Sequence, residues 1–391
     1  MCDEADRAHN AFAVRFDLKK KMKAVAVFPK SREVKVIADH PEPKISKPNE
    51  VKVRMLEVGV CGTDKEICRF DYGTPPSGSD YLALGHESLG EIVEVGAGVS
   101  DLKKGDLVVT MVRRPCEHAE CFACRNGRQD FCYTGDFKER GIKELHGFMT
   151  ELVVDEDRYF FKASPELRDV AVLTEPLTIA EKALNEVAQI QKRLPWGEPS
   201  DQSDGYTHKA VVLGAGPVGL LGAFALVVAG FKTFVYSRDP KPNPSADLVE
   251  KIGASYISST DHDLAQMAEE IGNIDLVYEA TGASKFAFET LEVLGTNGIF
   301  IFTGVPGRKA PVEIDTDLIM RNLVLKNQVV FGSVNAGRDA YLRAISDLEK
   351  FKARWPNETR ALITGRYAME DFSKLVIGTA PGIKNVIKIS E

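Results

Sequence analysis

Four cysteines that lie close together in the sequence could hold a metal ion. Four residues separate the first two, two residues separate the next pair and seven separate the last pair. Cysteine thiolates are favoured ligands of Zn²⁺, and four of them on one short segment can surround the ion with no position left for a substrate. This spacing predicts a structural zinc site made by Cys116, Cys121, Cys124 and Cys132.

A glycine-rich turn later in the chain is typical of dinucleotide binding. It follows an apolar, strand-like run at 209–213 and begins a helical pattern. Its glycines allow a tight turn, a close approach of the pyrophosphate and close packing of the helix on the strand. The N-terminus of that helix would direct its N–H groups at the phosphates. The turn consists of Gly214, Ala215, Gly216, Pro217, Val218 and Gly219.

Arg238 follows the next strand-like run and bears on the choice of cofactor. An NAD-specific site places a carboxylate near this point, about 20 residues past the turn, to bind the ribose 2′-hydroxyl. A guanidinium there favours a 2′-phosphate instead, while Asp239 keeps a carboxylate within reach of a free ribose. The alternative is that Arg238 is only a solvated surface charge. We therefore expect NADP to be preferred and NAD to be accepted.

A second set of metal-binding side chains is dispersed along the chain. Cys61, with Thr63 just after it, precedes His86 and Glu87, and Glu175 comes much later. A thiolate, an imidazole and a carboxylate can hold zinc with one exchangeable position, and such zinc makes a bound hydroxyl acidic enough to ionise near neutral pH. Taken singly, Cys61 and His86 would more often be ordinary structural residues. Beside a dinucleotide turn, the set predicts an oxidoreductase that removes hydride from an alcohol.

The composition favours small-molecule chemistry. The 391-residue chain carries a net charge of −7, and 44% of its residues are hydrophobic. These values are typical of a soluble protein with two domains and argue against nucleic acid or an anionic membrane as the partner. An odd number of cysteines, seven, without a signal peptide favours reduced thiols in the cytoplasm. Glycines interrupt the apolar stretch 210–230, which therefore predicts a strand, a turn and a helix instead of a membrane span.

The elements that position these residues fall into two patterns. Up to about Val154, short β-rich runs alternate with glycine and proline turns, which predicts a barrel-like domain. After a helical stretch at 173–187 and a polar loop at 195–206, strands and helices alternate as in a doubly wound parallel sheet. We expect strands over 22–27, 33–37, 50–58, 88–95, 106–112, 209–213, 232–236, 255–257, 276–279, 298–302, 324–331 and 386–389, and helices over 217–229 and 246–253.

The predicted fold class is α/β, with a doubly wound parallel-sheet (Rossmann) domain and a β-rich, barrel-like catalytic domain. Residues 1–21 would be a loose extension, and residues 22–187 would form the catalytic domain. Residues 188–333 would bind the dinucleotide, and residues 334–391 would return to the catalytic domain.

Short motifs through the whole chain point to a family. They are Cys61-Gly-Thr-Asp64, Leu84-Gly-His-Glu87, Arg113-Arg114, Gly127-Arg-Gln-Asp-Phe-Cys132, Glu139-Arg-Gly-Ile142, His146-Gly-Phe-Met149, Glu175-Pro-Leu177, Tyr278-Glu-Ala-Thr-Gly282 and Gly332-Ser-Val-Asn335. Over residues 22–391 the chain resembles the medium-chain, zinc-dependent alcohol dehydrogenases. The segments around Glu139, Glu175 and Asn335 resemble the glucose dehydrogenases of archaea in particular.

This resemblance implies roles for individual residues. Cys61, His86 and Glu87 would bind the catalytic zinc, with Glu175 as a further or alternative ligand. Thr63 would relay the substrate proton, and with Glu87 and Glu175 it would form the catalytic set. Sugar hydroxyls would be bound by Glu139 and Asn335, although Glu139 could instead form a surface ion pair. The implied cofactor contacts are Gly214, Gly216, Pro217, Val218, Gly219, Arg238, Asp239, Thr281 and Gly304.

The cysteine cluster departs from the family pattern. The family usually has two residues between the first two cysteines, whereas four residues, including His118, separate Cys116 from Cys121. Either the loop bulges or His118 replaces Cys116 as the ligand. We expect Cys116 to be the ligand because a wider loop costs little. The remaining cysteines, Cys2 and Cys68, should be unliganded.

The predicted reaction is the oxidation of D-glucose at C1 to gluconolactone, with hydride transfer to NADP or NAD and two zinc ions per chain. Another sugar, a polyol or threonine is the alternative substrate. A regulatory nucleotide-binding protein that has lost catalysis could share this fold, but the complete set of predicted catalytic residues argues against it. We expect a small sugar as substrate, no nucleic acid or membrane partner, and a homo-oligomer that is a dimer or a tetramer.

Overall fold

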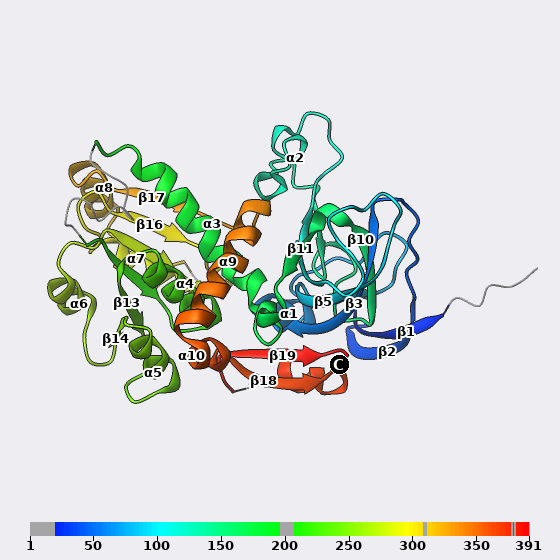
Figure 1. Cartoon of the computed structure of the whole chain (residues 1–391). Coiled ribbons are helices and arrows are strands. Elements are labelled where there is room, and N and C mark those ends of the chain that lie inside the picture. Colours follow the sequence, from blue (N-terminus) through cyan, green and yellow to red (C-terminus); the bar gives the residue numbers. More distant parts are fainter. Residues whose placement is uncertain (1–19, 196–206, 308–310, 377, 379–380, 391) are drawn as a thin grey trace, which may run out of the picture.

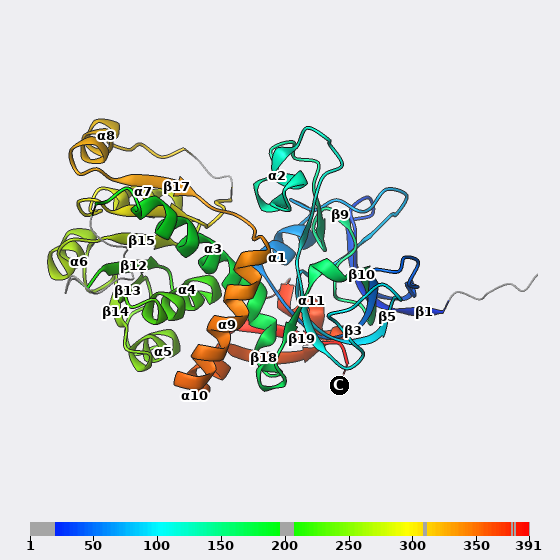
Figure 2. The ribbon, with the colours of Figure 1, turned by 45° about the horizontal axis from the view of Figure 1, so that its top comes forward.

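The computed structural model describes residues 20–195, 207–307, 311–376, 378 and 381–390 (Figure 1). Most of the predicted extension, residues 1–19, and most of the predicted loop, residues 196–206, lie outside the described residues. Figures 1 and 2 show a β-rich domain beside a domain built on a parallel sheet, with helices α3 (Thr174–Gln191) and α9 (Arg338–Arg354) between them. The predicted fold class is therefore confirmed.

A seven-stranded sheet forms the centre of the β-rich domain. Its strand β3 (Glu50–Gly59) pairs antiparallel with β5 (Glu87–Val95) and with β19 (Lys384–Lys388). Valines on β3 are fully buried, as expected for β-branched side chains on a packed sheet. The other strands of this domain are β1 (Lys21–Phe28), β2 (Glu33–Pro41), β4 (Leu82–Ala83), β6 (Leu107–Thr110), β7 (Arg113–Arg114), β8 (Lys138–Arg140), β9 (Glu144–Leu145), β10 (Leu152–Glu156), β11 (Phe160–Ala163) and β18 (Ile363–Ala368).

The second domain is built on six parallel strands in the order β14-β13-β12-β15-β16-β17. Numbered along the chain, this is the order 3-2-1-4-5-6 of dinucleotide-binding sheets, whose ligands bind at the carboxyl ends of the strands. The strands are β12 (Lys209–Leu213), β13 (Lys232–Ser237), β14 (Ser255–Ser258), β15 (Leu276–Glu279), β16 (Ile299–Phe302) and β17 (Val329–Gly332), and the helices are α4 (Pro217–Val228), α5 (Pro244–Lys251), α6 (Leu264–Ile271), α7 (Ser284–Leu291) and α8 (Thr316–Leu325).

Helices α3 and α9 pack against each other and against α4. On α9 the buried residues recur every three or four positions, which places them on one face of the helix. Phe351 and Trp355 contact the ring of Phe224 on α4, at centroid distances of 5.2 and 5.6 Å. Each helix also begins close to a predicted site residue, because Glu175 lies in the first turn of α3 and Asn335 lies just before α9.

The remaining helices are short. They are α1 (Gly62–Cys68), α2 (Phe122–Arg125), α10 (Pro356–Ala361) and α11 (Phe372–Val376). In the described parts of the chain, no helix is both long enough and apolar enough to cross a membrane.

Two sequence predictions in the last third of the chain were wrong or incomplete. The strand expected over 324–331 begins only at Val329, because Val324 and Leu325 end α8. The turn between them contains Lys326, Asn327 and Gln328, and Asn327 has a φ of 49°, a left-handed conformation that separates helix from strand. The long helix α9 was not predicted, because its exposed face is rich in charged residues that hide the apolar pattern. Most other predicted elements are present, with ends that differ by a few residues.

Candidate active site

Three of the dispersed side chains converge on one point in the β-rich domain. The ligand atoms of Cys61, His86 and Glu87 lie within 4.8 Å of one another. Cys61 is the N-cap of α1, and Glu87 is the first residue of β5. His86 and Glu87 are only 4% and 1% exposed. A thiolate, an imidazole and a carboxylate in this arrangement fit a zinc ion with an open position.

Asp64 holds both Cys61 and His86 in place. Its Oδ2 accepts a 2.8 Å hydrogen bond from the Cys61 backbone N–H, and its Oδ1 lies 3.6 Å from Nδ1 of His86. Burial opposes a charge on His86, but Asp64 and Cys61 raise the pKa of the imidazole well above its usual range. A carboxylate on one nitrogen of a histidine commonly orients the other nitrogen toward a metal. The Thr63 hydroxyl lies 3.9 Å from Sγ of Cys61 and therefore beside the three metal-binding side chains.

Lys384 is a buried partner of Glu87 that the sequence analysis missed. Its ammonium lies 2.6 and 2.5 Å from the two carboxylate oxygens of Glu87 and donates to the carbonyl of Val60. Burial opposes the charge, but Glu87 and then Cys61 raise the pKa of Lys384. No local motif marks this lysine, since it reaches the site only because β19 pairs with β3.

Glu175 lies close to this group but outside the 4.8 Å set. Burial raises the pKa of Glu175 to about 7, and the negative charge of Glu87 adds to this effect while His86 opposes it. Glu175 is carried by the first turn of α3, an element separate from β5 and α1, at whose starts the other residues of the group lie. Glu175 is thus available as a further ligand for a cation at this site.

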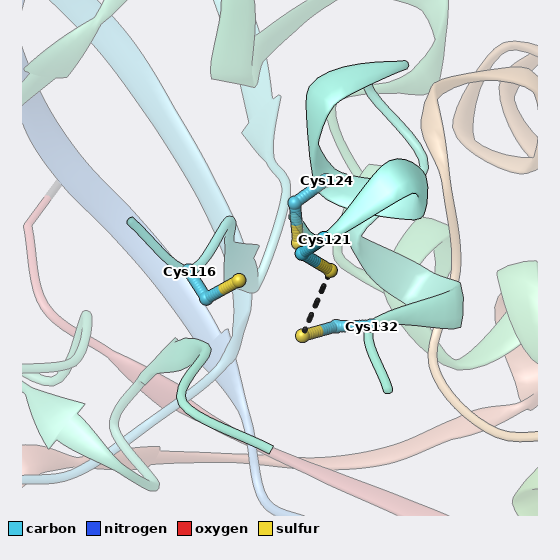
Figure 3. A group of neighbouring side chains, drawn as sticks. All are labelled: Cys116, Cys121, Cys124 and Cys132. Atoms are coloured by element: carbon cyan, nitrogen blue, oxygen red, sulfur yellow. Dashed lines mark hydrogen bonds between the residues drawn. The ribbon is translucent and has the colours of Figure 1, made fainter. Parts of the chain in front are cut away.

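The four clustered cysteines also converge. Their ligand atoms lie within 4.8 Å of one another, and Sγ of Cys121 lies 3.9 Å from Sγ of Cys132 (Figure 3). A backbone N–H at Cys124 lowers the pKa of Cys121. Burial opposes ionisation of Cys132, but the hydroxyl of Thr134 and nearby backbone N–H groups lower its pKa to about 6. Four thiols around one point fit a closed structural zinc site.

His118 does not lie in this cluster. Its Nε2 is 2.5 Å from Oδ2 of Asp136, and its Nδ1 is 3.3 Å from Oε1 of Glu120. Both ring nitrogens therefore face carboxylates, whereas Cys116 points toward the other three thiols (Figure 3). The four-residue spacing forms a loop that ends where the Cys121 backbone N–H donates to the carbonyl of His118.

The glycine-rich turn links β12 to α4 at the carboxyl end of the sheet. Gly214 has a φ of 97°, and a Cβ there would lie 2.7 Å from the methyl carbon of Thr281. A Cβ at Gly219 would overlap the carbonyl oxygen of Gly214, so the helix packs closely on the turn. A Cβ at Gly216 would meet no atom within 4 Å, which leaves room for a phosphate above the helix N-terminus at Pro217 and Val218.

The carboxylate of Glu279 binds the two loops that follow β15 and β16, next to the glycine-rich turn. Its Oε1 accepts hydrogen bonds from the backbone N–H groups of Thr281 and Gly282, at 2.6 and 2.8 Å, and from the Thr281 hydroxyl. Its Oε2 accepts from the backbone N–H of Gly304 at 3.1 Å. The carboxylate thereby ties together Thr281 and Gly304, which are predicted to contact the cofactor. The sequence analysis quoted Glu279 only as part of a motif, and no role was predicted for it.

Arg238 and Asp239 directly follow β13, beside the glycine-rich turn in the sheet order. Both residues are exposed. The carbonyl of Asp239 accepts a 2.8 Å hydrogen bond from the Tyr256 hydroxyl, which fixes the backbone at this point. The two side chains thus lie at the carboxyl edge of the sheet, where the ribose of a bound dinucleotide would lie.

Glu139 and Asn335 contact each other although 196 positions separate them in the sequence. The side-chain N–H of Asn335 donates a 2.9 Å hydrogen bond to Oε1 of Glu139. Glu139 is only 4% exposed, so it is not a surface ion-pair residue. The backbone of Gly141, two residues later, packs directly on Gly85 beside His86. The loop that carries Glu139 therefore packs against the residue that precedes His86.

The fold and these groups define a class of protein. A dinucleotide-binding sheet joined to a β-rich domain, with one open and one closed group of metal-binding side chains, is the arrangement of zinc-dependent medium-chain dehydrogenases. Comparison with protein families agrees, because residues 47–165 match the alcohol dehydrogenase GroES-like domain and residues 168–389 match the glucose dehydrogenase C-terminus. The chain belongs to the glucose dehydrogenase family within this class.

Relatives cover almost the whole chain. A glucose 1-dehydrogenase of Methanocella arvoryzae is 37% identical over 370 residues, covering 94% of this chain and 99% of the relative. One of Thermoproteus tenax is 38% identical over 369 residues, with the same coverage. The crystal structure of Haloferax mediterranei glucose dehydrogenase with NADP, zinc and gluconolactone has a TM-score of 0.82 and 30% identity, covering 95% of this chain and 100% of that one.

Proposed function

We propose that this protein oxidises D-glucose at C1 to gluconolactone, with NADP as hydride acceptor and zinc at the open site. The observation that carries the proposal is the hydrogen bond between Asn335 and the buried Glu139, on a loop that packs against Gly85 just before His86. This pair places a carboxylate and an amide side by side, and such groups accept and donate hydrogen bonds to the hydroxyls of a sugar. The relatives named above support the choice of substrate, since they are glucose dehydrogenases and one was solved with gluconolactone.

The side chains have complementary tasks in this reaction. A zinc ion held by Cys61 and His86, with Glu87 or Glu175, would supply Lewis acidity at the C1 hydroxyl, and NADP would take the hydride. Thr63, whose hydroxyl lies beside Cys61, relays the proton of that hydroxyl: it accepts this proton and passes its own to the cofactor ribose or to solvent. Glu139 and Asn335 bind other hydroxyls of the sugar, which excludes simple alcohols that cannot satisfy these polar groups.

Several finer points are part of the same proposal. We expect two zinc ions per chain, one at the closed cysteine site and one at the open site. NADP is preferred through Arg238, and NAD is accepted. The expected assembly is a homodimer or homotetramer in the cytoplasm, and helix α8 favours it, since it has no buried side chain and exposes Met320, Val324 and Leu325.

Two cysteines of α1 provide a matched test. Cys61→Ala should abolish turnover of glucose and lower the zinc content from two ions to one, because it removes a ligand of the open site alone. Cys68→Ala, at the other end of the same helix, should keep both zinc ions and full activity, since Cys68 is a buried thiol with no metal partner predicted. Zinc is measured by atomic emission, and activity by formation of NADPH with a panel of sugars, polyols, simple alcohols and threonine.

The same panel tests the alternatives. Wild-type protein that oxidises a polyol, another sugar or threonine more efficiently than glucose would show that the substrate is wrong and the dehydrogenase class right. Protein that binds NADP but oxidises nothing in the panel would favour a regulatory protein without catalysis. Full activity of Cys61→Ala would refute the role of the open site.

A further inference from the structure

Glu139 is held by three N–H donors on one of its two oxygens. Nε and Nη2 of Arg113 lie 3.0 and 2.9 Å from Oε1, and Nδ2 of Asn335 lies 2.9 Å from the same atom. Within the described residues, no protein donor is hydrogen-bonded to Oε2. The side chains of Arg113 and Glu139 are only 7% and 6% exposed, so each compensates the buried charge of the other. One oxygen is thus fixed by the protein, and the other is free to accept from a ligand.

Arg113 is itself held firmly. Strands β7 and β8 pair antiparallel with Arg113 directly opposite Glu139. The guanidinium lies 3.7 Å from the ring centroid of Phe137, and its Nη1 donates to the carbonyl of Asp130 at 3.4 Å. A planar fork stacked on an aromatic ring has little freedom to move. The position of Glu139 is therefore determined by Arg113 and not by solvent.

Lys182 of α3 acts on the other partner, Asn335. Its ammonium lies 3.1 Å from Oδ2 of Asp130 and donates at 3.1 Å to the carbonyl of Val334, the residue before Asn335. Lys182 is 4% exposed and lies 4.0 Å from the ring centroid of Phe131. Asp130 and Phe131 lie immediately before Cys132, in the segment 116–132 that holds the four clustered cysteines (the cysteine lobe). Lys182 thus joins α3, the cysteine lobe and the segment between β17 and α9.

Asn335 needs such support because its backbone is unfavourable. Its φ is 58°, in the left-handed region, and its Oδ1 accepts a 2.8 Å hydrogen bond from the backbone N–H of Ala336. The carbonyl of the preceding residue is the atom that Lys182 binds, so the lysine restrains the peptide that orients Asn335.

We propose that Arg113 and Lys182 are positioning residues for sugar recognition, Arg113 through Glu139 and Lys182 through the peptide that carries Asn335. This inference rests on the proposed function, because Glu139 and Asn335 are taken to bind sugar hydroxyls. Neither cation touches the sugar itself. Each lowers the KM for glucose by fixing a partner before the sugar arrives.

A double-mutant cycle, measured by steady-state kinetics, tests the role of Arg113. Arg113→Met should raise the KM for glucose roughly tenfold with a smaller change in kcat, while the KM for NADP and the zinc content stay at wild-type values. Arg113→Lys should raise the KM for glucose less than Arg113→Met does, because lysine keeps the positive charge but lacks the planar guanidinium. In a Glu139→Ala background, Arg113→Met should add almost nothing, because a residue that acts through the Glu139 carboxylate has lost its target.

The Lys182 arm is tested in the same way. Lys182→Met should raise the KM for glucose, and this effect should disappear in an Asn335→Ala background. Lys192→Met at the end of the same helix and Arg54→Met on β3 are matched controls, since both are surface cations away from the site, and both should behave as wild type. If a methionine variant does not fold, as judged by circular dichroism, Arg113→Lys and Lys182→Arg carry the same comparison.

The outcomes separate the two proposals. Wild-type protein that oxidises no aldose refutes the proposed function. Wild-type protein that oxidises glucose, with variants whose KM for glucose is unchanged, refutes the positioning roles alone. Losses that are fully additive with Glu139→Ala or Asn335→Ala, or that raise the KM for NADP equally, would show a general structural role and likewise overturn the inference.

Discussion

Acidic side chains at the site are matched by buried cations. Lys384 contacts Glu87, Arg113 contacts Glu139 and Lys182 contacts Asp130. Removing one member of such a pair leaves an uncompensated charge in a dry environment, which typically costs about 3–5 kcal/mol. The cofactor edge is different, because Arg238 and Asp239 are exposed there. A phosphate of the cofactor can therefore reach Arg238 without breaking an internal ion pair.

The variant Arg238→Ala tests whether Arg238 binds the 2′-phosphate of NADP. The KM for NADP should rise at least tenfold, which corresponds to about 1.4 kcal/mol of a charge-assisted contact, while the KM for NAD changes little. The measurement is steady-state kinetics with each cofactor. Lys241→Ala, three positions later, is the control, because Lys241 pairs with Glu250 on the surface and should not contact the cofactor. An equal loss with NAD and NADP would mean that Arg238 supports the loop instead of binding the phosphate.

At the level of elements, α3 and α9 connect the site to the rest of the molecule. Glu175 lies at the start of α3, and Asn335 lies three residues before the first residue of α9, so the packing of these helices sets how the two domains meet. A cavity of about 430 Å³ lies between them and the end of α4, and Glu181 of α3 and Asp347 of α9 line it. Burial raises the pKa of Glu181 to about 8, and Asp347 adds to the effect.

The raised pKa of Glu181 predicts how the stability of the folded protein depends on pH. The pKa of Glu181 is raised in the folded state, so between about pH 4.5 and pH 8 only the unfolded chain loses this proton, and stability falls as the pH rises through that range. Glu181→Gln removes the titration. We expect its melting temperature to fall less than that of wild type between pH 5 and pH 9, measured by differential scanning calorimetry.

Glu349→Gln on the exposed face of α9 is the control for this measurement and should follow wild type. A wild-type melting temperature that does not change over this range, or a parallel decrease in the Glu181→Gln variant, would contradict the buried carboxyl pair as its cause.

At the scale of the whole molecule, the chain leaves the β-rich domain, builds the parallel sheet and returns. β19 lies between β3 and β18 in the seven-stranded sheet, and it carries Lys384 to Glu87. The catalytic domain is therefore complete only when the last part of the chain is in place. Its folding requires contacts between segments that are far apart in the sequence.

Deletion of residues 382–391 should abolish folding or zinc binding at the open site, because an internal strand is lost. Lys384→Met removes the ammonium but keeps the strand. This variant should fold with lower stability and bind zinc more weakly at the site of Glu87. Deletion of residues 1–19, the predicted loose extension, is the control and should leave activity unchanged. Thermal unfolding and zinc content are the measurements, and a truncated chain with wild-type values of both would contradict this account.

The sequence by itself determined the features that depend on local spacing. The cysteines, the glycine-rich turn and the Gly-His-Glu motif each lie within one short segment, so their types and order indicate what they can bind. The alternation of strands and helices after residue 209 likewise predicted the parallel sheet, since apolar periodicity is a local property. Local patterns also misled, as in the segment 324–331, which was predicted as one strand but in which a left-handed Asn327 divides a helix from a strand.

Only the tertiary structure decided which distant residues meet. Lys384 and Glu87 are 297 positions apart, Asn335 and Glu139 are 196 apart, and Lys182 and Val334 are 152 apart. No spacing rule connects such residues, because strand order and helix packing bring them together. The resemblance to known dehydrogenases implied that Glu139 and Asn335 share a task. The cations that hold them became visible only when β7 paired with β8 and α3 packed beside the cysteine lobe, since buried charges find their partners through the fold and not along the chain.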